Sequence, residues 1–461
     1  MIRLMLSDCQ SNLDGELLGD DVQLSGFSID TRTLQPGDLY IAIDGEHFDG
    51  HAFCSDAENN GAIGLVVHTE VDTRLPQLKV KDTRVALGLL GKMWAEQFQV
   101  PTVAITGSNG KTTVKEMVAA IFEQLGPVLA TEGNFNNDIG VPLTLLRLRA
   151  HHHYAVIEIG ASAAGEVAKL SRLVQPDVAV VNNVGEAHLE GFGSIEAVAS
   201  AKSEIFEGLS PDGWAVINAD DRFAGVMHKA ASHAHIREFG THEDVAVRLM
   251  PEPQLKITVG EKLLSPRFGL LGLHNRMNAV AATAAAQCMD VQAVAIMSGL
   301  AQIRPVAGRL SKLPGINQST IIDDTYNANP VSVRAAIDVL AECDGMRMLV
   351  LGDLGELGPD EISVHAQLGV YAMQAGIDHC FTVGLLSGHA ANAFDGAMHF
   401  PDQEQLIDTL FGVINSDTTV LIKGSRSAQM EQVVEPLIDN NPQSEPEGDV
   451  DAADSSEIIS L

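Results

Sequence analysis

The chain has 461 residues, of which 45% are hydrophobic and 20% are charged, so it can bury a core and is not a disordered polymer. At roughly 150 residues per domain, this length predicts about three domains. A net charge of −32 excludes a large nonspecific nucleic-acid surface, which needs clustered Lys and Arg. The five cysteines include no C-x-x-C pair, so neither a disulfide framework nor a zinc ribbon is indicated.

The apolar runs of the sequence are all short. None reaches the ~18 residues of a membrane span. The opening residues, MIRLMLSDCQ, hold too short an apolar stretch for a signal peptide. We therefore expect a cytoplasmic protein without a membrane span.

The first part of the chain, residues 1–83, is predicted to be a small α/β domain. Short apolar runs alternate there with Pro-Gly and Asp-Gly turn signals, as in LQPGDLYIAIDG. Apolar residues then recur at three-to-four spacing over 85–98, which predicts a helix that links this domain to the next.

Strands and helices alternate through the central part of the chain, residues 84–309, which predicts a parallel sheet covered on both faces. The first strand, TVAIT, precedes a helical run at 111–125, and a small β excursion is expected at 245–268. The later strands of this domain are predicted at 154–160, 177–183 and 214–218.

The alternation starts again in residues 310–438, which predicts a third α/β domain of Rossmann-like, doubly wound character. The final residues, 439–461, are acidic and contain proline, so we expect them to be disordered. The predicted strands of the third domain are 319–324, 346–353, 379–384 and 418–424, and its helices are 331–343, 362–376 and 405–414.

A glycine-rich segment, TGSNGKTT, lies between a predicted strand and a predicted helix. Glycines let backbone N–H groups curve around a phosphate, Lys111 can reach the outer phosphates, and the Thr112 hydroxyl can bind Mg²⁺. The strict P-loop pattern has Gly where this chain has Ile105, so the loop is a variant. A glycine-rich turn with a solvated lysine is the alternative. The predicted phosphate-binding residues are Gly107, Ser108, Asn109, Gly110, Lys111, Thr112 and Thr113.

Further segments, in order from residue 30 to residue 432, resemble the Mur ligase family. They are GNFNNDIGVPLTLL, EIGA, NNVGEAHLEGFGS, AKSEIF, GLHNRMNAVAA, DDTYNANP and KGSR. The resemblance implies a three-domain α/β enzyme: a UDP-substrate-binding domain, a central P-loop ATPase domain and a Rossmann-like domain. It also implies ATP-dependent amide formation in peptidoglycan precursors, with Mg²⁺, through an acyl phosphate.

The segment DDTYNANP favours one activity within the family. It implies that UDP-N-acetylmuramoyl-tripeptide and D-alanyl-D-alanine are the substrates. We separately expect the protein to be a monomer. The D-N-P-R signature of the diaminopimelate-adding relative is absent, and Tyr326 replaces the histidine typical of folylpolyglutamate synthases. A related ligase with another amino-acid substrate remains an alternative, as does a P-loop regulator that makes no amide bond.

The resemblance also implies roles for single residues. Glu158 would bind Mg²⁺ beside the γ-phosphate, His188 would lie near the metal, and Lys423 would approach the reacting groups. Lys202 would be carbamylated by CO₂, which turns a cation into an oxygen donor for Mg²⁺; its alternative is an ordinary lysine paired with Glu204 or Glu207. The implied catalytic residues are Lys111, Glu158, His188, Lys202 and Lys423, and the implied metal ligands are Thr112, Glu158, His188 and Lys202.

The remaining implied contacts concern the nucleotide and the substrate. Asn275 would lie near the adenine, although its position also suits a helix cap. Arg309 would reach the phosphates and Asp324 the ribose, with Tyr326 beside it. The implied substrate-binding residues are Thr31, Arg32, Asn134, Asn136, Asn137, Asn327, Asn329 and Arg426.

Overall fold

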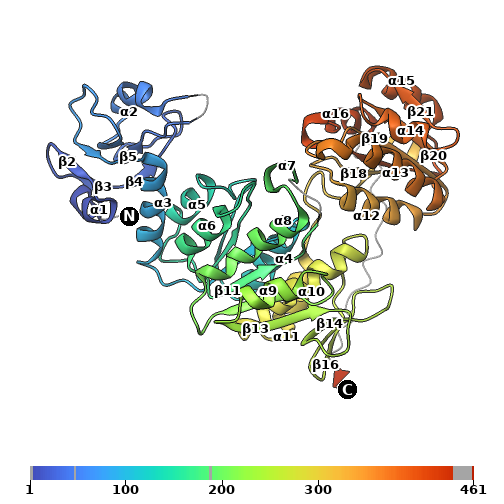
Figure 1. Ribbon diagram of the computed structural model, residues 1–461, viewed down its shortest axis with the longest axis horizontal. Coiled ribbons are helices and arrows are strands. Elements are labelled where there is room, and N and C mark those ends of the chain that lie inside the picture. The colour runs from blue at the N-terminus through green and yellow to red at the C-terminus, as the bar shows by residue number, and fades with distance from the viewer. Residues whose placement is uncertain (1–3, 46–47, 186–188, 440–458, 461) are drawn as a thin grey trace.

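A computed structural model describes residues 4–45, 48–185, 189–439 and 459–460. Three α/β bodies follow one another along an arc, with the N-terminal body at one end and the C-terminal body at the other (Figure 1). His188 and most of the predicted acidic tail lie outside the described residues. No helix in the described ranges is both long enough and apolar enough to cross a membrane.

The N-terminal body is built on a five-stranded sheet of order β2-β7-β6-β5-β4. Strands β4 to β7 run parallel and β2 is antiparallel to β7. This agrees with the predicted small α/β unit. Its elements are β1 Leu4–Met5, α1 Leu6–Leu13, β2 Glu16–Leu18, β3 Gln23–Leu24, β4 Gly26–Ser28, β5 Asp38–Ile41, α2 Cys54–Asn59, β6 Gly64–Val67 and β7 Gln77–Lys79.

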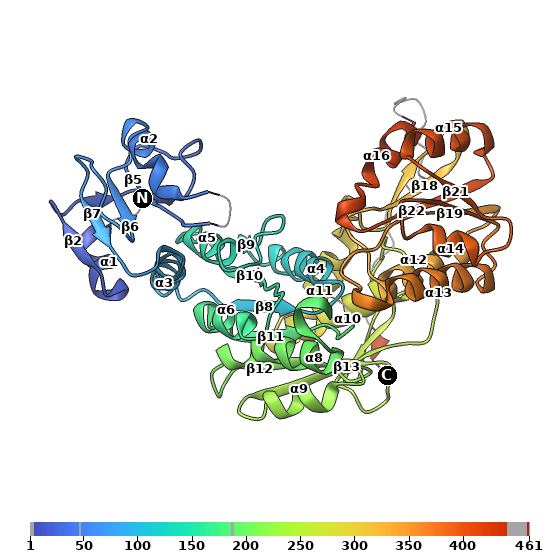
Figure 2. The ribbon, with the colours of Figure 1, turned by 45° about the horizontal axis from the view of Figure 1, so that its top comes forward.

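Helix α3 (Thr83–Ala95) joins the first two bodies, as the sequence pattern predicted. The side chain of Asp82 starts it by accepting the N–H groups of Arg84 and Val85. Trp94, near its end, donates its indole N–H to the Leu148 carbonyl at 3.0 Å. The helix is thereby fixed to the central body (Figure 2).

The central sheet has the order β23-β16-β15-β14-β13-β12-β11-β8-β10-β9. It is parallel from β9 to β14, and β15 and β16 continue it as antiparallel strands. The strands within 247–264 confirm the predicted β excursion. The last strand, β23, pairs with β16. The strands are β8 Thr102–Thr106, β9 Val128–Ala130, β10 Tyr154–Glu158, β11 Val178–Val181, β12 Trp214–Asn218, β13 His235–Gly240, β14 Val247–Leu249, β15 Ile257–Val259, β16 Lys262–Leu264 and β23 Ile459–Ser460.

Helices cover both faces of this sheet, as predicted. Along β8, Val103 and Ile105 face the cluster formed with α4, α10 and α11, whereas Ala104 faces the opposite cluster, with α6 and α8. This alternation explains why the strand is apolar throughout. The helices are α4 Lys111–Glu123, α5 Gly140–Leu146, α6 Glu166–Val174, α7 Leu189–Phe192, α8 Ile195–Ser203, α9 Ala224–Ala230, α10 Leu273–Cys288 and α11 Ala293–Gln302.

The C-terminal body has a six-stranded sheet of order β17-β18-β22-β19-β20-β21, parallel except for β17. Separate apolar clusters fill its two faces, so it is doubly wound as predicted. Its strands are β17 Ser311–Pro314, β18 Thr320–Asp324, β19 Met346–Gly352, β20 His379–Val383, β21 Met398–Phe400 and β22 Thr418–Lys423, and its helices are α12 Pro330–Ala341, α13 Glu361–Gln374, α14 Gly388–Asn392, α15 Gln403–Val413 and α16 Glu431–Val434.

Candidate active site

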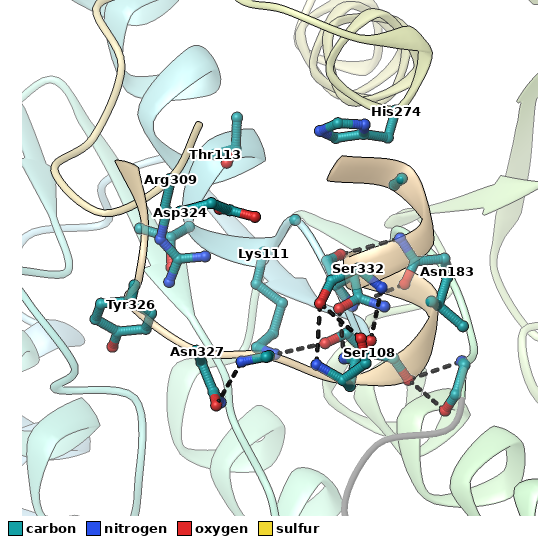
Figure 3. A pocket seen from close by; sticks show the side chains of 18 of the residues that line it. Ser108, Lys111, Thr113, Asn183, His274, Arg309, Asp324, Tyr326, Asn327 and Ser332 are labelled. Atoms are coloured by element: carbon teal, nitrogen blue, oxygen red, sulfur yellow. Dashed lines mark hydrogen bonds between the residues drawn. The ribbon is translucent and has the colours of Figure 1, made fainter. Parts of the chain in front are cut away.

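A cavity of about 1780 Å³ lies between the central and C-terminal bodies (Figure 3). The glycine-rich loop, the ends of neighbouring strands and the start of α10 line one side of the cavity. Strand ends, loops and parts of α12 and α13 of the C-terminal body line the other. The predicted residues that line this cavity are Ser108, Asn109, Gly110, Lys111, Thr112, Thr113, Asn134, Asn136, Asn137, Glu158, Asn275, Arg309, Asp324, Tyr326, Asn327, Asn329, Lys423 and Arg426.

The glycine-rich loop connects β8 to α4 as predicted, and two of its N–H groups are hydrogen-bonded within the protein. Ser108 N donates to the Asn183 carbonyl at 3.0 Å, and Asn109 N donates to the Asn183 side chain at 2.8 Å. The N–H groups at the start of α4 that have no partner in the helix ladder are those of Gly110, Lys111, Thr112 and Thr113. The phosphate-binding role of the loop stays a prediction, and the N-terminus of α4 is the part of it with unused N–H groups among the described residues.

Gly110 is required where the loop becomes helix. Its φ is +75°, in the left-handed region. A Cβ there would lie 2.5 Å from Asn278 Oδ1 and 2.8 Å from Asn182 Nδ2. Any side chain at this position would push the loop away from these two amides.

Lys111 lies at the start of α4, with its ammonium donating to the Gly107 carbonyl at 2.8 Å. Burial lowers its pKa, Glu158 opposes this shift and Arg309 adds to it. A lysine placed between a loop carbonyl and a cavity can exchange that carbonyl for a phosphate oxygen at little structural cost.

Glu158 ends β10 with only 2% of its surface exposed. Its Oε1 accepts the Asn136 side-chain amide at 2.7 Å, whereas its buried Oε2 has no hydrogen-bond partner among the described residues. A buried carboxylate oxygen without a donor suits a bound cation, because burying an uncompensated charge is costly.

Lys202 lies in the last turn of α8 and is 1% exposed. Burial, and then the Lys111 ammonium, lower its pKa to about 7. The pairing with Glu204 or Glu207, given as the alternative, is not observed among the described residues, and Lys202 is buried. The Glu204 side chain accepts the backbone N–H groups of Gly165 and Ala168 at the start of α6. The Glu207 side chain pairs with Arg172. Lys202 and Gly107 do not line the cavity.

On the C-terminal side, the Lys423 ammonium pairs with Asp324 at 2.6 Å and donates to the Asn327 carbonyl at 2.9 Å. Asp324 also accepts the Leu310 N–H at 3.2 Å. Burial raises the pKa of Asp324, and Lys423 opposes the rise. The ion pair therefore fixes the positions of the Asp324 and Lys423 side chains relative to each other, at the ends of the adjacent strands β18 and β22.

Arg309 crosses between the two bodies. Its guanidinium donates to Thr112 Oγ1 at 3.1 Å and lies 4.1 Å from the centre of the Tyr326 ring. Stacking on the ring fixes the plane of the guanidinium. The predicted phosphate-reaching arginine therefore already contacts the start of α4.

Asn275 lies in the first turn of α10 and is buried. The N-cap of α10 is Gly272, so the alternative of Asn275 as the helix cap is wrong. Its side chain donates to the Leu271 carbonyl at 2.8 Å and accepts from Asn278 at 3.1 Å, which fixes the amide beside the cavity.

The predicted substrate residues fall into separate groups. Asn137 Oδ1 accepts the N–H groups of Ile139 and Gly140, so it also shapes the turn before α5. Thr31 and Arg32 belong to the N-terminal body and do not line the cavity; the Arg32 side chain is 86% exposed and pairs with Asp30. Arg426 lines the cavity and pairs with Glu431 at 2.9 Å.

Asn182 and Asn183 also line the cavity, although no role was predicted for them from the sequence. They follow β11, where parallel strands place ligand sites, and that position was the available signal. Both side chains donate to the Asn109 carbonyl at 3.0 Å. These bonds fix the backbone of the glycine-rich loop at Asn109.

Three family descriptions match the chain: "Mur ligase family, catalytic domain" at 23–96, "Mur ligase middle domain" at 105–286, and "Mur ligase, glutamate ligase domain" at 308–426. The chain is 43% identical to the UDP-N-acetylmuramoyl-tripeptide--D-alanyl-D-alanine ligase of Escherichia coli, covering 95% of this chain and 99% of that one.

Solved structures agree with this likeness. MurF from Acinetobacter baumannii matches with a TM-score of 0.89 and 35% identity, over 95% of this chain and 99% of that one. MurF ligase from Thermotoga maritima, in complex with ADP, matches with a TM-score of 0.81 and 26% identity, over 89% and 96%. The chain belongs to the Mur ligase family.

Proposed function

We propose that this chain is an ADP-forming ligase that joins D-alanyl-D-alanine to UDP-N-acetylmuramoyl-tripeptide with ATP, in peptidoglycan precursor synthesis. The observation that carries this proposal is the sequence similarity to UDP-N-acetylmuramoyl-tripeptide--D-alanyl-D-alanine ligases over nearly the whole of both chains. The cavity supports it, because it joins a phosphate loop to cationic residues of a second body. Because the proposed reaction uses ATP and a UDP-linked substrate, it would take place in the cytoplasm.

The reaction we propose has two steps. The terminal carboxylate of the tripeptide attacks the γ-phosphorus of ATP, which breaks the bond to ADP and forms an acyl phosphate. The amine of D-alanyl-D-alanine then attacks the acyl carbon, loses a proton, and inorganic phosphate leaves. Lys111 and Arg309 would offset the charge of the transferring phosphoryl group, and Lys423 would approach it from the other body.

The residues of the site fit Mg²⁺. The buried Glu158 oxygen without a donor offers the hard anionic ligand that this ion prefers. We propose Thr112, Glu158 and a carbamylated Lys202 as ligands, and His188, outside the described residues, as a fourth. When bound, the ion would stabilise negative charge on the phosphoryl oxygens.

The N-terminal body would hold the UDP end of the substrate, with Thr31 and Arg32 as proposed contacts. The exposed Arg32 guanidinium is available to a diphosphate once it leaves Asp30. Asn134, Asn136, Asn137, Asn327, Asn329 and Arg426 would surround the peptide end. We propose Arg426 for the incoming carboxylate, because it is cationic and lines the cavity.

The limits we propose for the domains are 1–83, 84–309 and 310–438, followed by a tail at 439–461. Helix α3 begins at Thr83 and strand β17 begins at Ser311, so both junctions lie beside element ends.

ADP release tests the proposed function. It should require both the UDP-linked tripeptide and D-alanyl-D-alanine, with one phosphate released per amide formed. A panel of amino acids and peptides separates this ligase from relatives with other substrates. ATP hydrolysis that ignores both substrates would instead indicate a nucleotide-driven regulator.

We expect the C-terminal domain to move as a rigid body and close on ATP. Arg309, Asp324 and Tyr326 belong to one side of the cavity and the phosphate loop to the other, so nucleotide contacts on both sides favour closure. Solution scattering should show a smaller radius of gyration with an ATP analogue and the UDP-substrate than without them. The molecular mass obtained from the same scattering data tests the expected monomer. Identical dimensions with and without these ligands would contradict closure.

A further inference from the structure

Three asparagines from different elements are joined in series: Asn183 after β11, Asn109 in the phosphate loop and Asn329 before α12. The side-chain amide of Asn183 bonds to both the backbone N–H and the backbone carbonyl of Asn109. Its Oδ1 accepts the Asn109 N–H at 2.8 Å, and its Nδ2 donates to the Asn109 carbonyl at 3.0 Å. Two bonds to one residue fix the direction in which the Asn109 side chain leaves the loop.

That side chain meets the C-terminal domain. Asn329 Nδ2 donates to Asn109 Oδ1 at 2.7 Å, between residues 220 positions apart. The other end of the Asn329 amide is also engaged, because its Oδ1 accepts the Ser332 N–H at 2.9 Å and caps α12. The cap therefore turns the amide so that its donor points at the phosphate loop.

We infer that Asn183, Asn109 and Asn329 form an interdomain latch, in which they are positioning residues that tie the C-terminal domain to the phosphate loop. The latch rests on the proposed function only in taking a nucleotide as the ligand. It favours the arrangement in which Arg309 and Tyr326 face the start of α4. When fewer molecules hold this arrangement, the apparent affinity for nucleotide falls by the same fraction.

Asn329→Ser separates the latch from the helix cap. Serine keeps an oxygen that can cap α12 but lacks the amide donor for Asn109, whereas Asn329→Ala loses both. One hydrogen bond of this kind predicts that ADP binds about threefold to tenfold more weakly. Asn329→Ser and Asn329→Ala should lose affinity equally, and only Asn329→Ala should unfold at a clearly lower temperature.

A double-mutant cycle with Asn109→Ala tests the contact itself. The double variant Asn109→Ala, Asn329→Ser should bind ADP no more weakly than either single variant. The KM for ATP should rise by the same factor. Asp402→Ser, a cap exchange at the start of α15 in the same domain, is the matched control and should leave ADP affinity unchanged.

ADP titration needs no peptide substrate, so its result stands even if the proposed amide synthesis fails. Wild-type ADP affinity in Asn329→Ser would overturn the latch. The latch would also be overturned if Asn329→Ala bound ADP more weakly and Asn329→Ser did not, because the loss of affinity would then come from the lost helix cap. Losses that multiply in the double variant would show that the two side chains act independently, which also overturns it.

Discussion

Replacing Lys111 by alanine is expected to lower kcat/KM by about a thousandfold while the fold stays intact. An ammonium about 4 Å from a phosphate oxygen contributes on the order of 4 kcal/mol at an effective dielectric near 20, which corresponds to nearly that factor. The side chain contacts loop carbonyls rather than the apolar core, so its truncation leaves no large cavity. The rate of ADP release over a range of ATP concentrations gives kcat/KM, and a thermal unfolding curve reports the stability of the fold.

Lys229→Ala is the matched control, since this lysine is exposed on α9 of the same domain. It should keep wild-type activity. This would show that removing one positive charge from an acidic protein does not by itself cause the loss of activity. Near-wild-type turnover of Lys111→Ala at saturating ATP would refute the phosphate role.

Lys202→Ala is expected to lose activity and to regain part of it with a short added carboxylate. The proposed carbamate requires the neutral amine, and burial lowers the Lys202 pKa to about 7, so the reactive form is well populated near neutral pH. Its fraction rises as the pH rises through about 7 and falls below it. At limiting CO₂, activity should therefore fall as the pH is lowered through this range.

Lys202→Arg separates carbamylation from a role for positive charge. Arginine keeps the charge but cannot form the carbamate, so this variant should stay inactive with or without added carboxylate. Carbon-13 NMR with labelled bicarbonate should show an adduct in the wild type that is absent from both variants. An active arginine variant, or no adduct signal in the wild type, would return Lys202 to an unmodified lysine.

The sequence determined the three-domain α/β plan and the position of the glycine-rich loop between a strand and a helix. The strand TVAIT coincides with β8, and α4 begins at Lys111 as predicted. These features depend on local patterns, in which apolar residues mark buried strands and glycines mark the turn before a helix. Segments far apart in the chain, such as TGSNGKTT and DDTYNANP, were assigned to one site by family resemblance rather than by local pattern.

Only the tertiary structure decided how distant elements meet. Strand β22 lies between β18 and β19, although it follows both in sequence, because strand order depends on packing across the sheet. The direction of the Ser108 and Asn109 N–H groups, the burial of Lys202 and the Asn109–Asn329 contact were likewise invisible in the sequence. A residue type states what bonds a side chain can make, and its neighbours in space determine which of them form.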